Sequence, residues 1–201
     1  MEHTANRILL CGSLVELPQF SHENHEKRFY RFPLEVERLS GAVDTLPVIV
    51  PEAVLDAMDL SGGSMLAVTG QIRSFNSRAD TGRRLLISVY AEKLEACEQE
   101  PQNQVILQGT ICKSPVYRRT PLGREICDVM LAVSRPYHRA DYIPCIFWGR
   151  TAAGIAGCLI GEEISLTGRL QSRTYVKVLE DGSETRTAYE VSAMTAERLE
   201  K

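Results

Sequence analysis

The sequence predicts an all-β protein built from two tandem barrels of similar size. Three observations lead to this prediction: the chain repeats itself once, each repeat alternates apolar and polar residues, and one short helical segment interrupts each repeat. Of the 201 residues, 44% are hydrophobic and 24% are charged, as in an ordinary globular protein. Each half, of about 100 residues, is long enough to form its own hydrophobic core.

The two copies match in four blocks that follow the same order in each. The period is about 97–105 residues, which is the size of a domain and too long for a solenoid unit. The paired blocks are residues 6–14 with 103–111, 46–50 with 143–147, 69–74 with 167–172, and 91–95 with 196–200. We therefore expect a first domain over residues 1–96, a linker over 97–103 and a second domain over 104–201.

Within each copy the hydrophobic pattern predicts five strands and one short helix. Strand periodicity and helical spacing are clearest in the second copy. There the expected elements, in order, are strands at 105–111, 127–133 and 143–147, a helix at 151–159, and strands at 164–170 and 189–199. The fourth strand is expected to bend at Gly168, and Asp181-Gly182 is a hairpin turn signal.

Five strands with one helix between the third and the fourth describe the OB-fold, a small, partly open Greek-key barrel. The sequence therefore predicts two tandem OB-folds. Faces and loops of this barrel bind oligonucleotides in many proteins, so a nucleic acid is a candidate ligand.

The charge is distributed unevenly between the two copies. The net charge is −3, which by itself argues against a nucleic-acid binder. Residues 1–100 carry ten Lys and Arg against fifteen Asp and Glu, a net of −5, whereas residues 101–201 carry thirteen against eleven, a net of +2. A site for a polyanion is therefore expected in the second copy.

The N-terminus indicates a cytosolic location, and the cysteines do not contradict it. Six cysteines stand singly, without a Cys-x-x-Cys pair, at positions 11, 97, 112, 127, 145 and 158. We expect all six to be reduced thiols that act as small apolar residues. No basic region leads into a hydrophobic run at the N-terminus, so no secretory signal is visible and a cytoplasmic location is expected.

Five stretches of the second copy form a specific combined pattern. They are residues 120–124 (TPLGR), 131–135 (LAVSR), 141–152 (DYIPCIFWGRTA), 166–175 (LTGRLQSRTY) and 193–199. Through them the second copy resembles the bacterial single-stranded-DNA-binding protein family over nearly its whole length, and the first copy resembles it in outline. The resemblance implies a non-enzymatic protein, without cofactor or metal, that binds single-stranded DNA in replication, recombination or repair.

The residues that would carry this activity are aromatic and basic. A sequence-tolerant binder needs aromatic faces for base stacking and cations along the phosphates. By resemblance, the stacking positions are Tyr137, Tyr142, Trp148 and Tyr175. The cations that accompany them are Arg118, Arg119, Arg124, Arg150, Arg169, Arg173 and Lys177. The alternative is that Trp148, the single tryptophan, packs in the core or in an interface, and that Tyr175 packs in the core.

The first copy lacks these stacking residues. At the offsets of the repeat, the four aromatic positions are occupied by Ser40, Thr45, Pro51 and Ser77. Glu35 and Glu37 would in addition repel a phosphate backbone. We therefore expect the first copy to have a structural role, holding the geometry of the second.

The resemblance also bears on assembly and on partners. Members of the family typically assemble four OB-folds, so a chain with two copies implies a homodimer. They usually carry a flexible tail with an acidic tip that recruits replication and repair enzymes, whereas residues 197–201 of this sequence lie at the end of the last expected strand. Recruitment by that route is therefore not expected.

Two other classes of function compete with DNA binding. An enzyme is disfavoured, because His22 and His25 lack a third metal ligand and no phosphate loop or nucleophile motif is present. An OB-fold module that binds other proteins, with weak or no DNA affinity, is favoured by the acidic first copy and opposed by the aromatic residues of the second. Steep salt dependence would distinguish DNA binding from this alternative.

Overall fold

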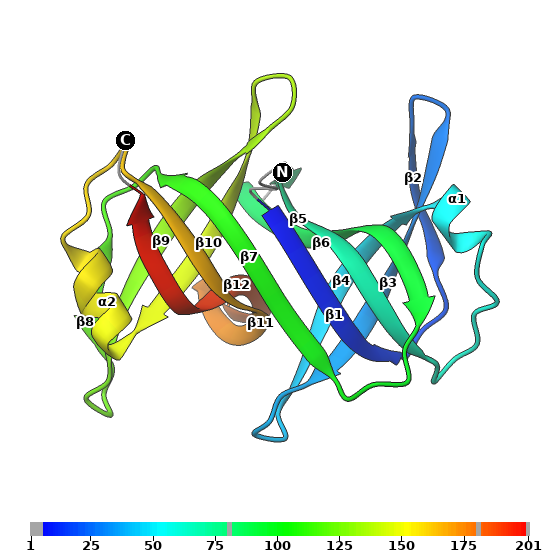
Figure 1. Ribbon diagram of the computed structural model, residues 1–201, viewed down its shortest axis with the longest axis horizontal. Helices are drawn as coiled ribbons and strands as arrows, with labels where there is room; N and C mark the ends of the chain where they lie inside the picture. The colour runs from blue at the N-terminus through cyan, green and yellow to red at the C-terminus, as the bar shows by residue number, and fades with distance from the viewer. Residues whose placement is uncertain (1–5, 80–81, 180–181, 200–201) are drawn as a thin grey trace.

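The computed structural model describes residues 6–79, 82–179 and 182–199, which form two barrels side by side (Figure 1). In the first copy the elements are β1 (Asn6–Leu14), β2 (Gln19–Asn24), β3 (Lys27–Glu37), β4 (Val43–Pro51), α1 (Glu52–Leu55), β5 (Met65–Ala79) and β6 (Gly82–Ala96). In the second they are β7 (Gln102–Ile111), β8 (Val116–Arg119), β9 (Glu125–Arg135), β10 (Arg139–Trp148), α2 (Gly149–Ala156), β11 (Glu163–Leu179) and β12 (Gly182–Leu199). The all-β prediction of two tandem OB-folds is confirmed.

Both barrels belong to one continuous sheet. The strand order is β2-β3-β4-β6-β5-β1-β7-β11-β12-β10-β9-β8. Each barrel closes through a second pairing of its first strand, β1 with β3 and β7 with β9. In each, the strand before the helix pairs in parallel with the last strand, β4 with β6 and β10 with β12. These pairings are the Greek-key connections of an OB-fold.

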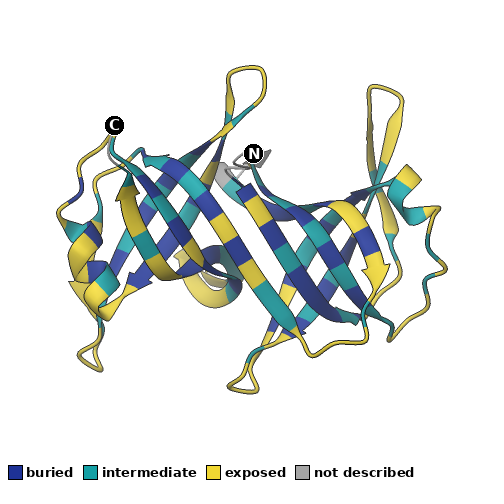
Figure 2. Ribbon diagram, in the orientation of Figure 1, coloured by how far each residue is buried: buried dark blue, intermediate teal, exposed yellow. Residues whose placement is uncertain are grey.

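Alternation along the strands fills the two cores. Burial along β1 and β9 changes from residue to residue (Figure 2), because successive side chains of a strand point to opposite faces. Leu10, Leu34 and Val48 are fully buried in the first barrel, and Leu107, Leu131 and Phe147 in the second. The surface left outside these cores carries the candidate site.

The first strands of the two copies join the barrels to each other. β1 and β7 pair antiparallel from Asn6↔Leu107 to Cys11↔Gln102. The start of each strand therefore lies opposite the later part of its equivalent, as expected for two copies related by a two-fold axis. Asn6 donates from Nδ2 to the carbonyl oxygen of Ile72 at 2.7 Å, and Asn103 donates in the same way to Leu170 at 2.7 Å. The repeat in the sequence therefore corresponds to an internal, nearly two-fold arrangement.

Two expectations about the elements need correction. Each copy has six strands where five were predicted, because β2 and β8 are added as hairpin strands; almost all their residues lie on the surface, so no apolar alternation marks them. The linker expected over 97–103 is shorter, since Gln102 and Asn103 already pair with β1 as the first residues of β7. The turn residues Glu180 and Asp181 lie outside the described residues.

The interpretation of all six cysteines as reduced thiols is wrong for one pair. Cys11 and Cys97 form a disulfide across a sequence separation of 86 residues. The fold brings them together through β5. Cys97 follows β6 and donates its backbone N–H to the carbonyl oxygen of Met65, the first residue of β5, and Ala67, two residues further along β5, pairs with Cys11. Cys112, Cys127, Cys145 and Cys158 are free thiols. Burial raises the pKa of Cys145 far above its ordinary value, so this thiol remains protonated.

Candidate nucleic-acid interface

A groove on the second copy brings four of the predicted site residues together. It has a volume of about 550 Å³, and Arg124, Trp148, Arg169 and Arg173 line it. The other lining residues are Arg38, Gln171, Ser172, Ser192, Ala193 and Met194. One aromatic side chain and three arginines that are distant in sequence therefore border the same hollow.

Trp148 is anchored at one edge and open to solvent over part of its surface. It stands at the end of β10, and its indole Nε1–H donates to Oγ of Ser192 at 3.1 Å. The residue is 37% exposed, whereas its neighbour Phe147 is fully buried. Trp148 therefore lies outside the buried core of the chain, and a fixed, partly exposed ring is what base stacking requires.

The arginines of the groove differ in how their polar atoms are used. The Nε atom of Arg169 is the one buried side-chain nitrogen or oxygen in the described residues without a hydrogen-bond partner. Arg173 has its Nε 3.8 Å from Oε1 of Glu190, and its guanidinium carbon lies 5.7 Å from the ring centroid of Tyr175. Tyr175 is itself 37% exposed. Arg173 thus connects the groove to the second predicted stacking residue, on the β11–β12 hairpin.

Two predicted arginines are already paired with carboxylates. Arg118 lies 2.7 Å from Asp128, and Arg119 lies 3.0 Å from Glu125. Hydrogen bonds from Tyr117 and Arg119 lower the pKa of Glu125, so this carboxylate stays charged beside the arginine. These two cations therefore contribute less net positive potential than the sequence suggested, and the ion pairs are exposed and weak.

The remaining predicted residues lie away from the groove. Tyr142 is on the outward face of β10, as alternation predicts, but about 20 Å from Trp148, because six residues of strand separate them. Tyr137 is 91% exposed in the β9–β10 turn. Arg150 is exposed in α2, and Lys177 is exposed on β11. The predicted set is therefore not one compact cluster.

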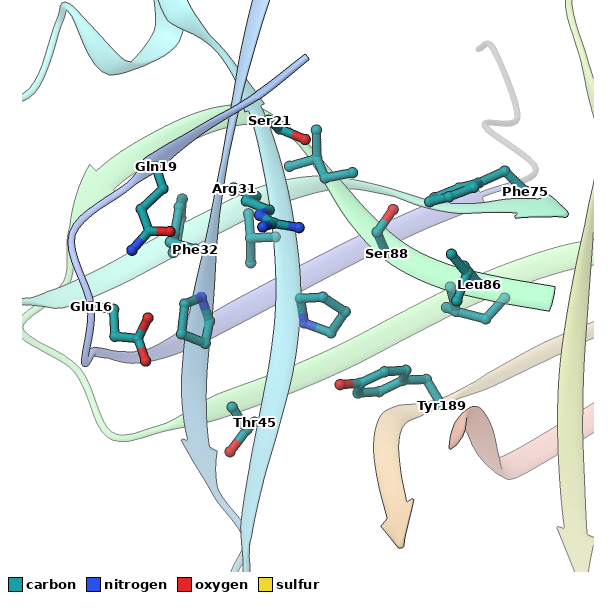
Figure 3. A pocket seen from close by; sticks show the side chains of 15 residues that line it. Glu16, Gln19, Ser21, Arg31, Phe32, Thr45, Phe75, Leu86, Ser88 and Tyr189 are labelled. Carbon is teal, nitrogen blue, oxygen red and sulfur yellow. The ribbon is translucent and has the colours of Figure 1, made fainter. Parts of the chain in front are cut away.

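The first copy has a hollow of its own, with different chemistry. It measures about 460 Å³ and includes Thr45, Arg31, Phe75 and, from β12 of the second copy, Tyr189 (Figure 3). Prolines, leucine and isoleucine make up much of the remaining lining. Thr45 stands on β4 where Tyr142 stands on β10, so the outward face of the first copy lacks the stacking residue at this position.

Sequence reasoning missed an aromatic cluster on the β2–β3 hairpin. The ring of His22 stacks on that of Phe29 at 4.9 Å between centroids, and Phe20 meets Tyr30 edge-on at 6.0 Å. The guanidinium carbon of Arg28 lies 5.3 Å from the Phe20 centroid. Phe20 and His22 carried no signal, because β2 has no apolar alternation; only the register of the hairpin places them beside Phe29 and Tyr30.

Two tandem OB-folds whose second barrel presents aromatic rings and arginines define a protein of the nucleic-acid-binding OB-fold class. Comparisons with known proteins specify the class further. The model of the single-strand binding protein family matches residues 102–199, which is the second copy. The chain therefore belongs to the single-strand binding protein family.

Individual relatives support this assignment, and a solved structure shares the fold. The chain is 38% identical over 80 residues to single-stranded DNA-binding protein B of Bacillus subtilis, covering 36% of this chain and 71% of that protein. It is 32% identical over 105 residues to single-stranded DNA-binding protein 3 of Listeria innocua, covering 49% of this chain and 62% of that protein. The fold resembles that of the wild-type single-stranded DNA binding protein from Thermus aquaticus, with a TM-score of 0.80, 21% identity, and coverage of 98% and 93% of the two chains.

Proposed function

We propose that this chain binds single-stranded DNA without sequence preference, in replication, recombination or repair, through its second OB-fold. The observation that carries the proposal is the groove in which the partly exposed ring of Trp148 lies among Arg124, Arg169 and Arg173. Every base has a face that can stack on an aromatic ring, so stacking tolerates any sequence, while arginines follow the phosphates.

The geometry also ranks the predicted contacts. Trp148 and Tyr175 are the stacking positions next to the groove arginines. Arg169 lines the same groove, so its guanidinium is a candidate for a charge-assisted hydrogen bond to a phosphate, although its Nε atom is itself buried. Tyr142 and Tyr137 would extend the path of the strand beyond the groove. Arg118 and Arg119 rank lower because each is already paired with a carboxylate that offsets its charge.

Titration of Trp148 fluorescence with oligo(dT) tests the proposed function. Because Trp148 is the single tryptophan, the signal reports one site per chain. We expect saturable quenching at low salt that reverses as salt rises, with log K falling linearly against log salt, because bound phosphates release counterions. Absence of any change at low salt would overturn the proposal and favour the protein-interaction alternative.

We also propose that the chain forms a homodimer that contains four OB-folds, and that it acts in the cytoplasm by binding alone, without catalysis. The family resemblance and the two barrels per chain support the first point. Sedimentation equilibrium should give twice the chain mass of 22.4 kDa. A species of 22.4 kDa at micromolar concentration would contradict the dimer.

Among the described residues, no helix is long and apolar enough to cross a membrane.

A further inference from the structure

Two buried aspartates lock the barrels together in a reciprocal way. Asp44 on β4 and Asp141 on β10 are equivalent at the repeat offset of 97, and both are 0% exposed. Asp44 accepts hydrogen bonds from the backbone N–H of Ser172 at 2.7 Å and from its Oγ at 3.1 Å. Asp141 accepts one from the backbone N–H of Ser74 at 2.8 Å. In each copy the aspartate side chain therefore binds a backbone N–H of the fifth strand of the other copy, β11 for Asp44 and β5 for Asp141.

An arginine six residues earlier in the same copy accompanies each aspartate. Arg38 donates to both carboxylate oxygens of Asp44, from Nε at 2.6 Å and from Nη2 at 2.5 Å. Arg135 donates from Nη1 to Asp141 at 3.4 Å. Burial alone would raise the pKa of Asp44, but the hydrogen bonds from Arg38 and Ser172 outweigh it and hold that pKa below its ordinary value. Asp44 therefore stays ionised and fixes the position of Arg38.

Arg38 belongs to the first copy but lines the groove of the second. Its side chain is 23% exposed, and it borders the same hollow as Trp148, Arg169 and Arg173. Its Nη2 lies 3.4 Å from the carbonyl oxygen of Ser172, the residue before Arg173. Among the described residues, Nη1 of Arg38 has no hydrogen-bond partner, so a donor remains at the surface while the carboxylate that balances its charge is fully buried.

We propose that Arg38 is a phosphate-contacting residue of the groove in the second copy, held in place by Asp44 and Ser172 across the boundary between the copies. This inference rests on the proposed function. The first copy has no aromatic residue at its own stacking positions, but through Arg38 it contributes a cation to the site of the second copy. A guanidinium that keeps one donor face on a carboxylate can offer another to a phosphate, because its five N–H groups spread over a planar fork.

The test uses charge-neutral double variants of the full chain. Arg38→Gln/Asp44→Asn removes the cation together with its buried partner, so the net charge is unchanged and no buried charge is left unpaired. We expect the slope of log K against log salt for oligo(dT) to become shallower by about 0.7, the value for one phosphate contact with a single strand. We also expect an affinity about tenfold lower at low salt, since a hydrogen bond to a charged group is lost.

The equivalent pair in the other copy supplies the control. Arg135→Gln/Asp141→Asn alters the matching cluster, in which Arg73 of the first copy also pairs with Asp141, at 3.0 Å. None of these three residues lines the groove, so the salt slope of this variant should equal that of the wild type. Arg38→Lys should keep the wild-type slope, because the cation remains. Equal slopes for the two double variants would overturn the inference, whereas a wild-type chain that fails to bind oligo(dT) would overturn the proposed function itself. Thermal unfolding of each variant shows whether it is folded, and Arg38→Met with Asp44→Leu replaces the first pair if it is not.

Discussion

Removing the aromatic rings of Trp148 and Tyr175 together is expected to weaken the binding of oligo(dT) by roughly 30-fold to 20,000-fold. Each stacked base contributes about 1–3 kcal/mol by alanine substitution, and about 1.4 kcal/mol corresponds to a factor of ten in affinity. Both residues are 37% exposed, so their truncation to alanine removes surface and not core. The loss should therefore fall on binding while the fold remains intact.

Equilibrium titration at a fixed low salt concentration measures this effect, with a labelled oligo(dT) because the double variant has no tryptophan. The matched control changes the equivalent positions of the first copy, Pro51→Ala with Ser77→Ala, and should leave affinity within a factor of two. Circular dichroism melts of both variants should resemble that of the wild type. Affinity that survives the loss of both rings would show that the arginines alone bind the strand.

The fold was predictable because period-two alternation and internal duplication are properties of the sequence itself. Strands with one buried face, such as β7 and β9, follow that pattern closely. β2 and β8 were missed because almost all their residues are on the surface, so no hydrophobic signal distinguishes them from loops. The boundary of the linker was misjudged for a related reason: Gln102 and Asn103 are polar, and pairing with β1 alone makes them part of a strand.

For the site, residue types were predictable and partners were not. Candidate residues for base stacking and phosphate binding could be named from motifs, but the pairing of Arg118 with Asp128 depends on the register between β8 and β9. The contact between Asp44 and Ser172 spans 128 residues, and that between Cys11 and Cys97 spans 86. The sequence did contain a signal that Asp44 is special, because both copies share the Arg-x5-Asp spacing, at 38–44 and 135–141.

Gly168→Ala is expected to destabilise the protein by about 3 kcal/mol, in the range of severe overpacking. A Cβ atom at this position would lie 2.3 Å from the carbonyl oxygen of Ser192 and 3.0 Å from Cα of Ala193. These contacts are with backbone, which cannot move aside as a side chain can. The register of β11 and β12 shifts between Thr167 and Gly168, so the bend expected from the sequence is a bulge where β11 leaves β7 and continues with β12 alone.

Chemical denaturation of the variant measures the loss, and two other glycines show whether close backbone approach is the cause. Gly70, the equivalent residue, would place a Cβ 2.0 Å from the carbonyl oxygen of Tyr90, so Gly70→Ala should be at least as damaging. Gly154 lies in α2 with no atom within 4 Å of an added Cβ, and Gly154→Ala should stabilise the protein by about 0.5–1 kcal/mol. Similar stability of all three variants would mean that the strand crossing tolerates a side chain, and that the glycines at 70 and 168 do not set the curvature that places Arg169 in the groove.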